Sequence, residues 1–348
     1  MMGMATEISA VSTRDSLGTR GEDFFPGEWR AEDAIRVCRK NVEGWRGIPK
    51  ETFILETISG GMTNHLYRCS TTHPGVPQSS VLLRIFGQGT SVCRTKDNLI
   101  FKAMSEAGLG PELHATFEQG RIEEFLDDSR PLTNEEMQMP TYAKQIAKSL
   151  AMVHELQIPI PRSEPQLLQD LKQVIASLDV NARALLPHTP EYYMEKMEKI
   201  LAGTDSPIVF CHNDLQEGNI MVNEKRGDIT LIDFEYGGYN YAMFDVGNHF
   251  AEYAFVYNDL PAGDLGFELR KDAYPSRKEM VEFLGEYNSV LQNGTEPEDM
   301  IETVQRFILA SHLYWGLWSA GMGSRGAGYV SYMNTRLSEF ERISEGLL

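Results

Sequence analysis

Apolar and polar residues alternate over three short stretches in the first third of the chain. These stretches are Thr52 to Ile58, Asn64 to Ser70 and Ser80 to Phe86. Their β-branched and aromatic residues predict strands, and the two glycines between the first two stretches predict a hairpin. Residues with helical spacing precede them, from Glu32 to Trp45, and follow them, from Lys96 to Ala107. The sequence therefore predicts a small antiparallel sheet accompanied by helices.

Helical spacing dominates the rest of the chain, with apolar faces in Tyr142 to Leu156 and Ile301 to Met322 and a polar helical pattern in Gln166 to Leu201. The first 25 residues mix charged residues, Ser, Thr and Gly without an apolar core, which excludes a signal peptide and predicts a disordered leader. We expect an α+β fold with two lobes. The expected regions are a leader at 1–25, a small sheet-containing lobe at 26–125 and a larger, mostly helical lobe at 126–348.

Residues suited to catalysis gather between residues 208 and 234. An apolar run from Ile208 leads into His212-Asn213-Asp214, and Asn219 begins a second apolar run. After a charged turn, a third run from Ile229 leads into Asp233-Phe234. Protein kinases use this layout, in which one Asp accepts the proton of the substrate hydroxyl, an Asn five positions later ligates Mg²⁺ and a second Asp before Phe also ligates Mg²⁺.

These residue types suit phosphoryl transfer. Mg²⁺ prefers a few oxygen ligands beside nucleotide phosphates, which the Asp233 carboxylate and the Asn219 amide can provide. A separate carboxylate must accept the proton of the attacking hydroxyl, and Asp214 is placed for this role. We therefore predict ATP- and Mg²⁺-dependent phosphoryl transfer with Asp214 as the base and with Asn219 and Asp233 as metal ligands.

The same segments resemble the choline and ethanolamine kinases. Cys211 to Ile220 resembles the catalytic loop of that family, Leu231 to Tyr236 its metal-binding segment and Tyr239 to Phe250 the segment that follows. The resemblance extends, with gaps, from Glu51 to Phe340 and looks closer to choline kinases. It implies a bilobal protein-kinase-like fold, ATP-dependent phosphorylation of a small amino alcohol and a homodimer.

Two further residues of these segments have expected roles in catalysis. We expect Gln216 to help position the reacting groups. We expect Asp245 to brace the catalytic loop through hydrogen bonds to its backbone rather than to act chemically.

The predicted hairpin is the candidate phosphate loop. Gly60 and Gly61 have no Cβ, so backbone N–H groups can approach a triphosphate there, and Thr63 or Asn64 can add side-chain hydrogen bonds. No G-x-x-x-x-G-K-[ST] motif occurs, so a P-loop ATPase lacks its main support.

Other residues of the first lobe are candidates for contact with the nucleotide. Arg84 is a charge within an apolar strand and needs an anionic partner. The resemblance implies that this Arg binds phosphate, and we expect Asp97 or Glu106 to hold it in place. In Gly120 to Leu126, the resemblance implies main-chain contacts from Glu124 and Leu126 to adenine.

Aromatic and acidic residues lie beyond Asp245. Trp315 and Trp318 share one face of a helix, where both would be core residues in an unknown fold. The resemblance implies instead that rings and a carboxylate enclose a quaternary ammonium, with cation–π attraction worth about 2 kcal/mol per well-placed ring. The matching substrate residues are Asp214, Glu252, Tyr257, Trp315, Trp318 and Tyr332. Since Ala327 stands where the family has an aromatic residue, ethanolamine remains a candidate acceptor beside choline.

The composition limits the partners and the location. The 348 residues include 32 basic and 50 acidic ones, and the net charge of −18 argues against nucleic-acid or anionic-membrane partners. No apolar run approaches the length of about 18 residues that a membrane span needs, so we expect no membrane insertion. Four scattered cysteines without zinc-site spacing indicate reduced thiols in a cytoplasmic protein.

Three alternatives remain beside a choline kinase that makes phosphocholine for phosphatidylcholine synthesis. An ethanolamine kinase or a dual enzyme would use the same chemistry with a less crowded ammonium site. An antibiotic or small-metabolite phosphotransferase would need an acidic pocket, which Trp315 and Trp318 argue against. An inactive kinase-like binding or scaffold protein would not need Asp214, Asn219 and Asp233 together.

Overall fold

The computed structural model describes residues 30–58, 64–87, 93–162, 164–202, 204–259, 264–292 and 294–346. The predicted leader and the candidate phosphate-loop residues Gly60, Gly61 and Thr63 lie outside the described residues. The described chain divides into two compact units. The sheet unit contains the described residues up to Pro131 together with Gly218–Ile232, and the helical unit contains the described residues of Leu132–Glu217 and those from Asp233 onward. The fold is α+β, as predicted.

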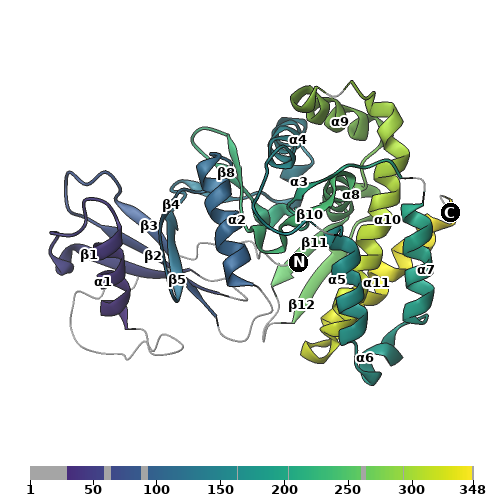
Figure 1. The fold of residues 1–348 in the computed structure, drawn as a ribbon, viewed down its shortest axis with the longest axis horizontal. Helices are drawn as coiled ribbons and strands as arrows, with labels where there is room; N and C mark the ends of the chain where they lie inside the picture. The colour runs from purple at the N-terminus through teal and green to yellow at the C-terminus, as the bar shows by residue number, and fades with distance from the viewer. Residues whose placement is uncertain are drawn as a thin grey trace. The chain divides into compact units, whose positions relative to one another are not determined.

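The sheet unit is built on a five-stranded antiparallel sheet with the order β1-β2-β3-β5-β4 (Figure 1). Its strands are β1 (Phe53–Ile58), β2 (Asn64–Thr71), β3 (Ser80–Phe86), β4 (Leu113–Phe117) and β5 (Gly120–Glu124). The three strands that the sequence predicts are confirmed to within one residue at each end. The unit also holds a smaller sheet of β6 (Ser129–Pro131), β8 (Ile220–Asn223) and β9 (Ile229–Leu231).

The described residues of the sheet unit include two α-helices. Helix α1 (Ala31–Asn41) contributes Ala34 and Cys38 to a core shared with buried strand residues such as Val81 and Leu83. It ends before the predicted Trp45, which is buried and whose indole N–H donates to the Gln78 carbonyl oxygen at 2.7 Å. Helix α2 (Arg94–Glu106) matches the predicted helix. The short 3₁₀ helix η1 (Lys50–Thr52) leads into β1.

The helical unit contains nine α-helices and two small antiparallel sheets among its described residues (Figure 1). The helices are α3 (Asn134–Met137), α4 (Pro140–His154), α5 (Gln166–Ser177), α6 (Val180–Leu185), α7 (Pro190–Leu201), α8 (Ala242–Glu252), α9 (Arg277–Leu291), α10 (Pro297–Gly321) and α11 (Ala327–Ser344). The sheets pair β7 (Ile208–Cys211) with β10 (Gly238–Tyr241) and β11 (Phe255–Asp259) with β12 (Leu265–Leu269). Short 3₁₀ helices of this unit are η3 (Phe234–Tyr236), η5 (Lys271–Ala273) and η6 (Gly323–Arg325), and η2 (Glu217–Asn219) begins in this unit and ends in the sheet unit.

The helical pattern from Gln166 to Leu201 corresponds to three helices. The Asp179 carboxylate caps α6 by accepting from the Ala182 N–H at 2.8 Å, so a new helix starts there. Pro190 occupies the first turn of α7, where its missing N–H is tolerated, and the Thr189 hydroxyl caps that helix.

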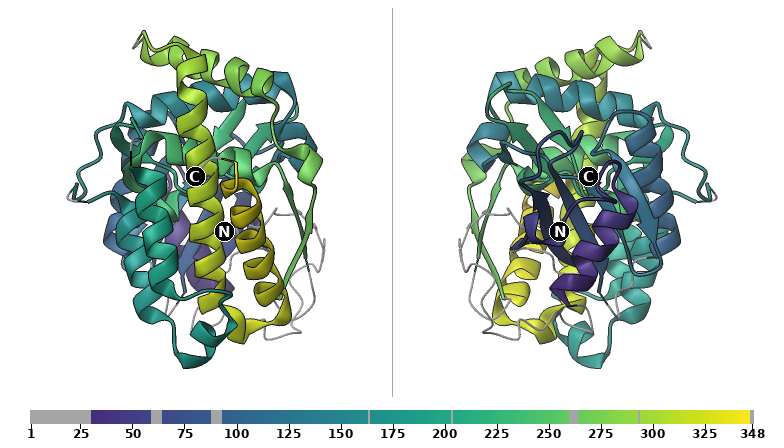
Figure 2. Two further views of the ribbon diagram at one scale, coloured as in Figure 1. Left: turned by 90° about the vertical axis from the view of Figure 1, so that its right-hand side faces the viewer. Right: turned by 90° about the vertical axis from the view of Figure 1, so that its left-hand side faces the viewer.

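The core of the helical unit is a layer formed by α8, α10 and α11. Every residue of α8 is buried, and α8 and α11 both pack against the long helix α10. Figure 2 shows α11, in yellow, beside α10. A Cβ on Gly247 would lie 2.6 Å from the Phe307 carbonyl carbon, so only glycine permits this approach of α8 to α10. The close packing fixes α8, whose first and last turns carry Asp245 and Glu252.

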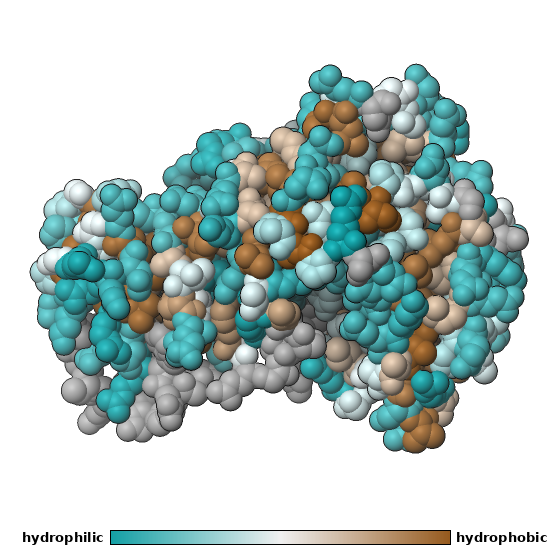
Figure 3. All heavy atoms as spheres, viewed as in Figure 1, coloured by the Kyte–Doolittle hydropathy of each residue, from teal (hydrophilic) through white to brown (hydrophobic). Residues whose placement is uncertain are grey.

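Hydrophilic residues predominate on the face of the molecule in Figure 3, where hydrophobic residues occur in small separate patches. Within the described ranges, no helix has the length and apolar character needed to cross a membrane.

Candidate active site

The loop that carries Asp214 turns sharply after β7. Asn213 adopts a left-handed backbone conformation with φ of 68°, which is uncommon for a residue other than glycine. Its side chain holds this turn, because Nδ2 donates to the Tyr236 carbonyl oxygen at 2.9 Å and Oδ1 accepts from Asn240 at 2.8 Å. The strain is therefore maintained by specific contacts, as is common at functional sites.

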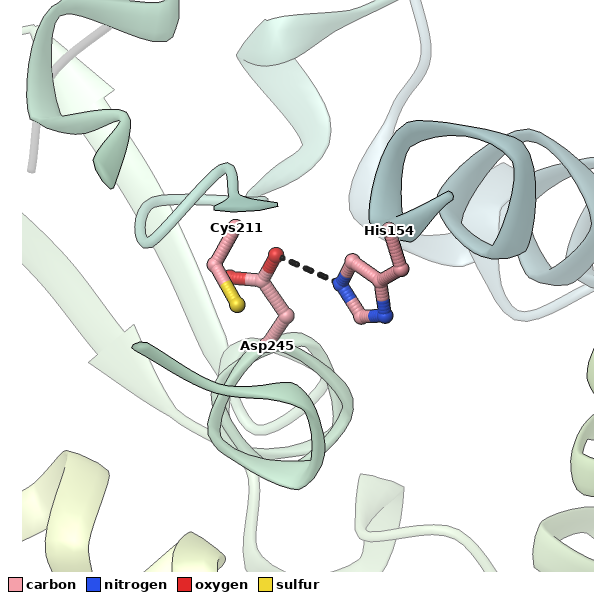
Figure 4. A group of neighbouring side chains, drawn as sticks. All are labelled: His154, Cys211 and Asp245. Atoms are coloured by element: carbon pink, nitrogen blue, oxygen red, sulfur yellow. Dashed lines mark hydrogen bonds and ion pairs between the residues drawn. The ribbon is translucent and has the colours of Figure 1, made fainter. Parts of the chain in front are cut away.

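Asp245 fixes the same loop from the first turn of α8. One carboxylate oxygen accepts the backbone N–H of His212 at 2.6 Å, and the other accepts the backbone N–H of Asn213 at 2.6 Å. His154 on α4 contacts Asp245 through Nε2 at 3.1 Å (Figure 4), and its Nδ1 lies 2.6 Å from the Tyr287 hydroxyl. The expectation that Asp245 braces the catalytic loop through its backbone is confirmed.

The cluster of His154, Cys211 and Asp245 has donor atoms within 4.8 Å of one another, which is close enough for a metal ion. Its chemistry does not suit one. Burial raises the pKa of the Cys211 thiol well above its usual value, and Sγ donates to the Asn240 and Tyr241 carbonyl oxygens at 3.6 Å. A protonated thiol is a poor ligand, and both Asp245 oxygens already accept backbone hydrogen bonds. The cluster in Figure 4 is therefore a structural support for the loop.

Asp214 is buried next to other acidic groups. Its backbone N–H donates to His212 Nδ1 at 3.3 Å. Burial raises the pKa of the Asp214 carboxyl, His212 opposes the increase, and the charge of Glu252 adds to it. A raised pKa makes a carboxylate a better proton acceptor near neutral pH, which suits a general base.

Glu217 is a buried acid that sequence reasoning did not select. Burial, followed by the charges of Glu252 and Asp214, raises the pKa of Glu217 to about 8. Its Oε2 has no hydrogen-bond partner among the described side chains. The acidic residues of this region therefore act on one another, which favours a cationic ligand.

Three of the predicted substrate residues form one hydrogen-bonded cluster. The Tyr257 hydroxyl donates to Glu252 Oε2 at 2.8 Å and lies 2.9 Å from the Tyr332 hydroxyl. Glu252 ends α8, Tyr257 lies on β11 and Tyr332 on α11, so three separate elements meet here. The structure brings these residues together as the sequence predicts.

The two tryptophans belong to a second cluster. The Trp315 ring packs edge-on against Tyr236 at 5.5 Å and against Trp318 at 5.6 Å between ring centroids. Trp315 is fully buried, with its indole N–H donated to Asn248 Oδ1 at 2.8 Å, whereas Trp318 is half-buried. Asp214 links the clusters electrostatically, because its charge acts on both Tyr236 and Glu252.

The predicted metal ligands lie at the two ends of the β8–β9 hairpin. The Ile232 N–H donates to the Asn219 carbonyl oxygen at 3.0 Å, and Asp233 is the next residue along the chain. Asp233 has a left-handed backbone conformation, with φ of 62°. Within the described ranges, no hydrogen bond or ion pair engages its half-buried carboxylate, which therefore remains available for a cation.

Arg84 is held by an acid that the sequence does not identify. Its Nε donates to Glu123 Oε1 at 2.6 Å, and Arg121 donates to the same oxygen at 2.6 Å. The expectation of Asp97 or Glu106 is wrong, because Asp97 accepts from Arg121 at 2.6 Å. Arg84 and Glu123 lie on paired strands, so their side chains meet without a contribution from α2.

The remaining predicted site residues differ in burial and in hydrogen bonding. Asn64 is buried at the start of β2, and its Oδ1 accepts from Arg94 at 3.1 Å. The Glu124 N–H is donated to the Glu112 carbonyl oxygen at 2.8 Å, so this N–H is already engaged within the protein. Leu126 is half-buried and follows the end of β5. Gln216 is buried, and its N–H donates to the Asp214 carbonyl oxygen at 3.1 Å.

Sequence reasoning missed Tyr236 and Arg336 as members of these clusters. Tyr236 ends the short segment Phe234-Glu235-Tyr236, whose sequence has no apolar periodicity from which the position of the Tyr236 ring could be predicted. Arg336 follows Tyr332 by one helical turn, so the two share a helix face, which the spacing of α11 could have revealed.

Comparisons with known proteins point to one family. The model of the choline/ethanolamine kinase family matches residues 55–341. A human choline/ethanolamine kinase is 33% identical over 383 aligned positions, which cover 96% of this chain and 95% of that protein. A probable ethanolamine kinase from Arabidopsis thaliana is 32% identical and covers 98% of this chain and 96% of that protein. The crystal structure of a choline kinase from Cryptosporidium parvum has a TM-score of 0.76 and 27% identity, and covers 91% of this chain and 96% of that one.

Proposed function

Because this chain belongs to the choline/ethanolamine kinase family, we propose that it transfers the γ-phosphoryl group of ATP to the hydroxyl of choline. The hydroxyl oxygen forms the new bond to phosphorus, its proton passes to Asp214, and ADP leaves. The products are phosphocholine and ADP. In the pathway that the family serves, phosphocholine leads to phosphatidylcholine.

The observation that carries the proposal is the position of Asp214 between acidic and aromatic groups. Its pKa is raised, chiefly by burial, and its charge acts on both Glu252 and Tyr236. A cationic acceptor bound by these groups would bring its hydroxyl to a base that the Asp245 brace holds in place.

The donor chemistry fits Mg²⁺. Asp233 offers a carboxylate without a protein partner among the described residues, and Asn219 offers an amide oxygen. These two residues would hold the ion, which when bound neutralises charge on the transferring phosphates. Arg84, oriented by Glu123, would contact phosphate oxygens beside the Gly60-Gly61 loop, and Glu124 and Leu126 would face adenine. Gln216 would help to position the reacting groups.

The acceptor site would combine Glu252, Tyr257 and Tyr332 with the rings of Trp315 and Trp318. Aromatic faces attract a quaternary ammonium and also remove its methyl groups from water. Edge-on packing of Trp315 and Trp318 at 5.6 Å supports a cage with walls at different angles. Since relatives include proteins named as ethanolamine kinases, use of ethanolamine, alone or beside choline, is the alternative.

We also propose a cytoplasmic location, in keeping with free thiols at Cys38, Cys69, Cys93 and Cys211. A homodimer, which the family resemblance implies, stays a prediction.

The test is product identification by ³¹P NMR after incubation with ATP, Mg²⁺ and one acceptor. We expect a phosphocholine resonance that requires the protein, the metal and choline together. ADP formation without any phosphorylated amino alcohol would contradict the proposal and favour another hydroxyl substrate. No nucleotide turnover would favour the inactive kinase-like binding protein.

A further inference from the structure

Arg336 on α11 is fully buried and its guanidinium is surrounded by protein acceptors and rings. Nε donates to the Tyr332 hydroxyl at 2.7 Å, and Nη2 donates to Glu252 Oε1 and lies 3.3 Å from the Tyr257 hydroxyl. The guanidinium carbon also lies 3.7 Å from the centroid of the Phe255 ring. Arg336 thus contacts three of the proposed acceptor-site residues at once.

The Arg336–Glu252 pair neutralises the α8 carboxylate whose charge acts on Asp214. Both side chains are almost completely buried, at 0% and 1% exposure, so each charge depends on the other. The second Glu252 oxygen accepts from Tyr257 at 2.8 Å. Each carboxylate oxygen of Glu252 therefore accepts a hydrogen bond from a protein side chain.

A second anchor fixes Arg336 from the opposite side. Nη1 lies 3.3 Å from His312 Nδ1, and an arginine can only donate, so Nδ1 accepts and Nε2 carries the imidazole proton. Nε2 then donates to the Tyr274 hydroxyl at 2.9 Å, and Tyr274 donates to Glu339 at 3.4 Å. Burial and Arg336 lower the pKa of His312 well below its usual value, which keeps it neutral.

Resting on the proposed function, we propose that Arg336 is a positioning residue of the acceptor site and sets its preference for a quaternary over a primary ammonium. It acts through Glu252, Tyr257 and Tyr332. The rigid guanidinium fork holds these three side chains in one arrangement, which a flexible ammonium group would not do.

The preference follows from hydrogen bonding. A primary ammonium needs acceptors for three N–H donors, and a site that leaves them unpaired binds it poorly. Arg336 and Tyr257 each donate to one Glu252 oxygen, which leaves this carboxylate fewer acceptor positions for a ligand. A quaternary ammonium has no N–H group and binds through the ring faces, so it loses no hydrogen bond in this arrangement.

The experiment compares wild type with Arg336→Lys and Arg336→Gln, using choline and ethanolamine as separate acceptors. For Arg336→Gln, we expect KM for choline to rise about tenfold while kcat changes less than about threefold, and the choline-to-ethanolamine ratio of kcat/KM to fall about tenfold. Arg336→Lys keeps the charge and should recover part of the ratio. KM for ATP should stay within about twofold in both variants.

The matched control is Arg306→Lys on α10, whose native partner Glu302 is exposed and lies 2.9 Å away. This change should leave both acceptors unaffected. If the Arg336 variants do not fold, Tyr332→Phe tests the same cluster, because it removes the hydroxyl that accepts from Arg336 and lies 2.9 Å from the Tyr257 hydroxyl. It should lower the ratio about threefold.

An unchanged acceptor ratio in a folded variant would overturn the role of Arg336, as would an equal loss of kcat for both acceptors, which indicates a structural effect alone. These outcomes leave the proposed function intact. A wild-type protein without turnover of either amino alcohol would overturn the proposed function itself, and with it this inference.

Discussion

Replacing Asp245 by Asn tests how far activity depends on the brace behind the catalytic loop. The substitution keeps the shape of the side chain and leaves one oxygen, but it turns the other acceptor into an NH₂ donor. That donor would face the N–H of His212 or the N–H of Asn213, each of which now donates to a carboxylate oxygen at 2.6 Å. One buried backbone N–H therefore loses its acceptor.

The size of the effect follows from these contacts. A hydrogen bond to a charged group is worth about 1.5–3 kcal/mol, and a buried donor without a partner costs about 1–3 kcal/mol. Because these terms overlap, we expect the free energy of unfolding to fall by about 2–4 kcal/mol, which most domains survive. Since Asp214 follows Asn213 directly, a shift of about 1 Å in the loop should lower kcat about 100-fold.

The assay pairs urea unfolding, followed by far-UV circular dichroism, with steady-state kinetics for ATP and choline. KM for both substrates should stay within about threefold, because the brace touches neither proposed binding cluster. Asp272→Asn, the same change at an exposed position, is the control and should alter neither quantity. The proposed role of Asp245 would be refuted if the Asp245→Asn protein had a free energy of unfolding within about 0.5 kcal/mol of wild type and a kcat within about threefold of it.

Three further predictions concern the base, the Arg84 partner and a buried histidine. Asp214→Asn should keep the dissociation constant for ATP, measured by calorimetry, and lower kcat by about 10²–10⁴-fold; near-normal kcat would refute the base. Glu123→Gln should raise KM for ATP about tenfold and leave KM for choline unchanged, because Arg84 loses the charge that orients it. Burial lowers the pKa of His249 from 6.5 to about 4. Between these pH values the unfolded chain binds a proton that the folded protein does not. The free energy of unfolding should therefore fall as pH falls through this window, by about 3 kcal/mol in total. His249→Phe should remove this part of the pH dependence in urea unfolding, and an unchanged slope would contradict the assignment.

The residues that the sequence predicted best are those carried by local pattern. The strands β1, β2 and β3 alternate clearly, and Asn219 and Asp233 flank one short hairpin. Their positions could therefore be predicted without knowledge of long-range packing.

Residues whose partners are distant in sequence could not be predicted in this way. Glu123 contacts Arg84 because their strands pair, although the two residues are 39 positions apart. The sequence instead predicted a partner on the helix that follows β3. Arg336 meets Glu252 across 84 positions, and only the packing of α11 beside α10 and β12 brings them together. The start of α11 shows the same limit, because a Cβ on Gly328 would lie 2.0 Å from the Leu265 carbonyl oxygen. The glycines near Ala327 therefore serve close packing, which composition alone did not explain.

The most direct measurement is coupled ADP release with ATP and Mg²⁺, which gives kcat/KM for choline, for ethanolamine and for a control without acceptor. We predict acceptor-dependent turnover with a choline preference of about tenfold or more, which corresponds to about 1.4 kcal/mol in the transition state. A preference for ethanolamine would contradict the proposed aromatic cage, and turnover that neither amino alcohol increases would contradict the proposed kinase activity.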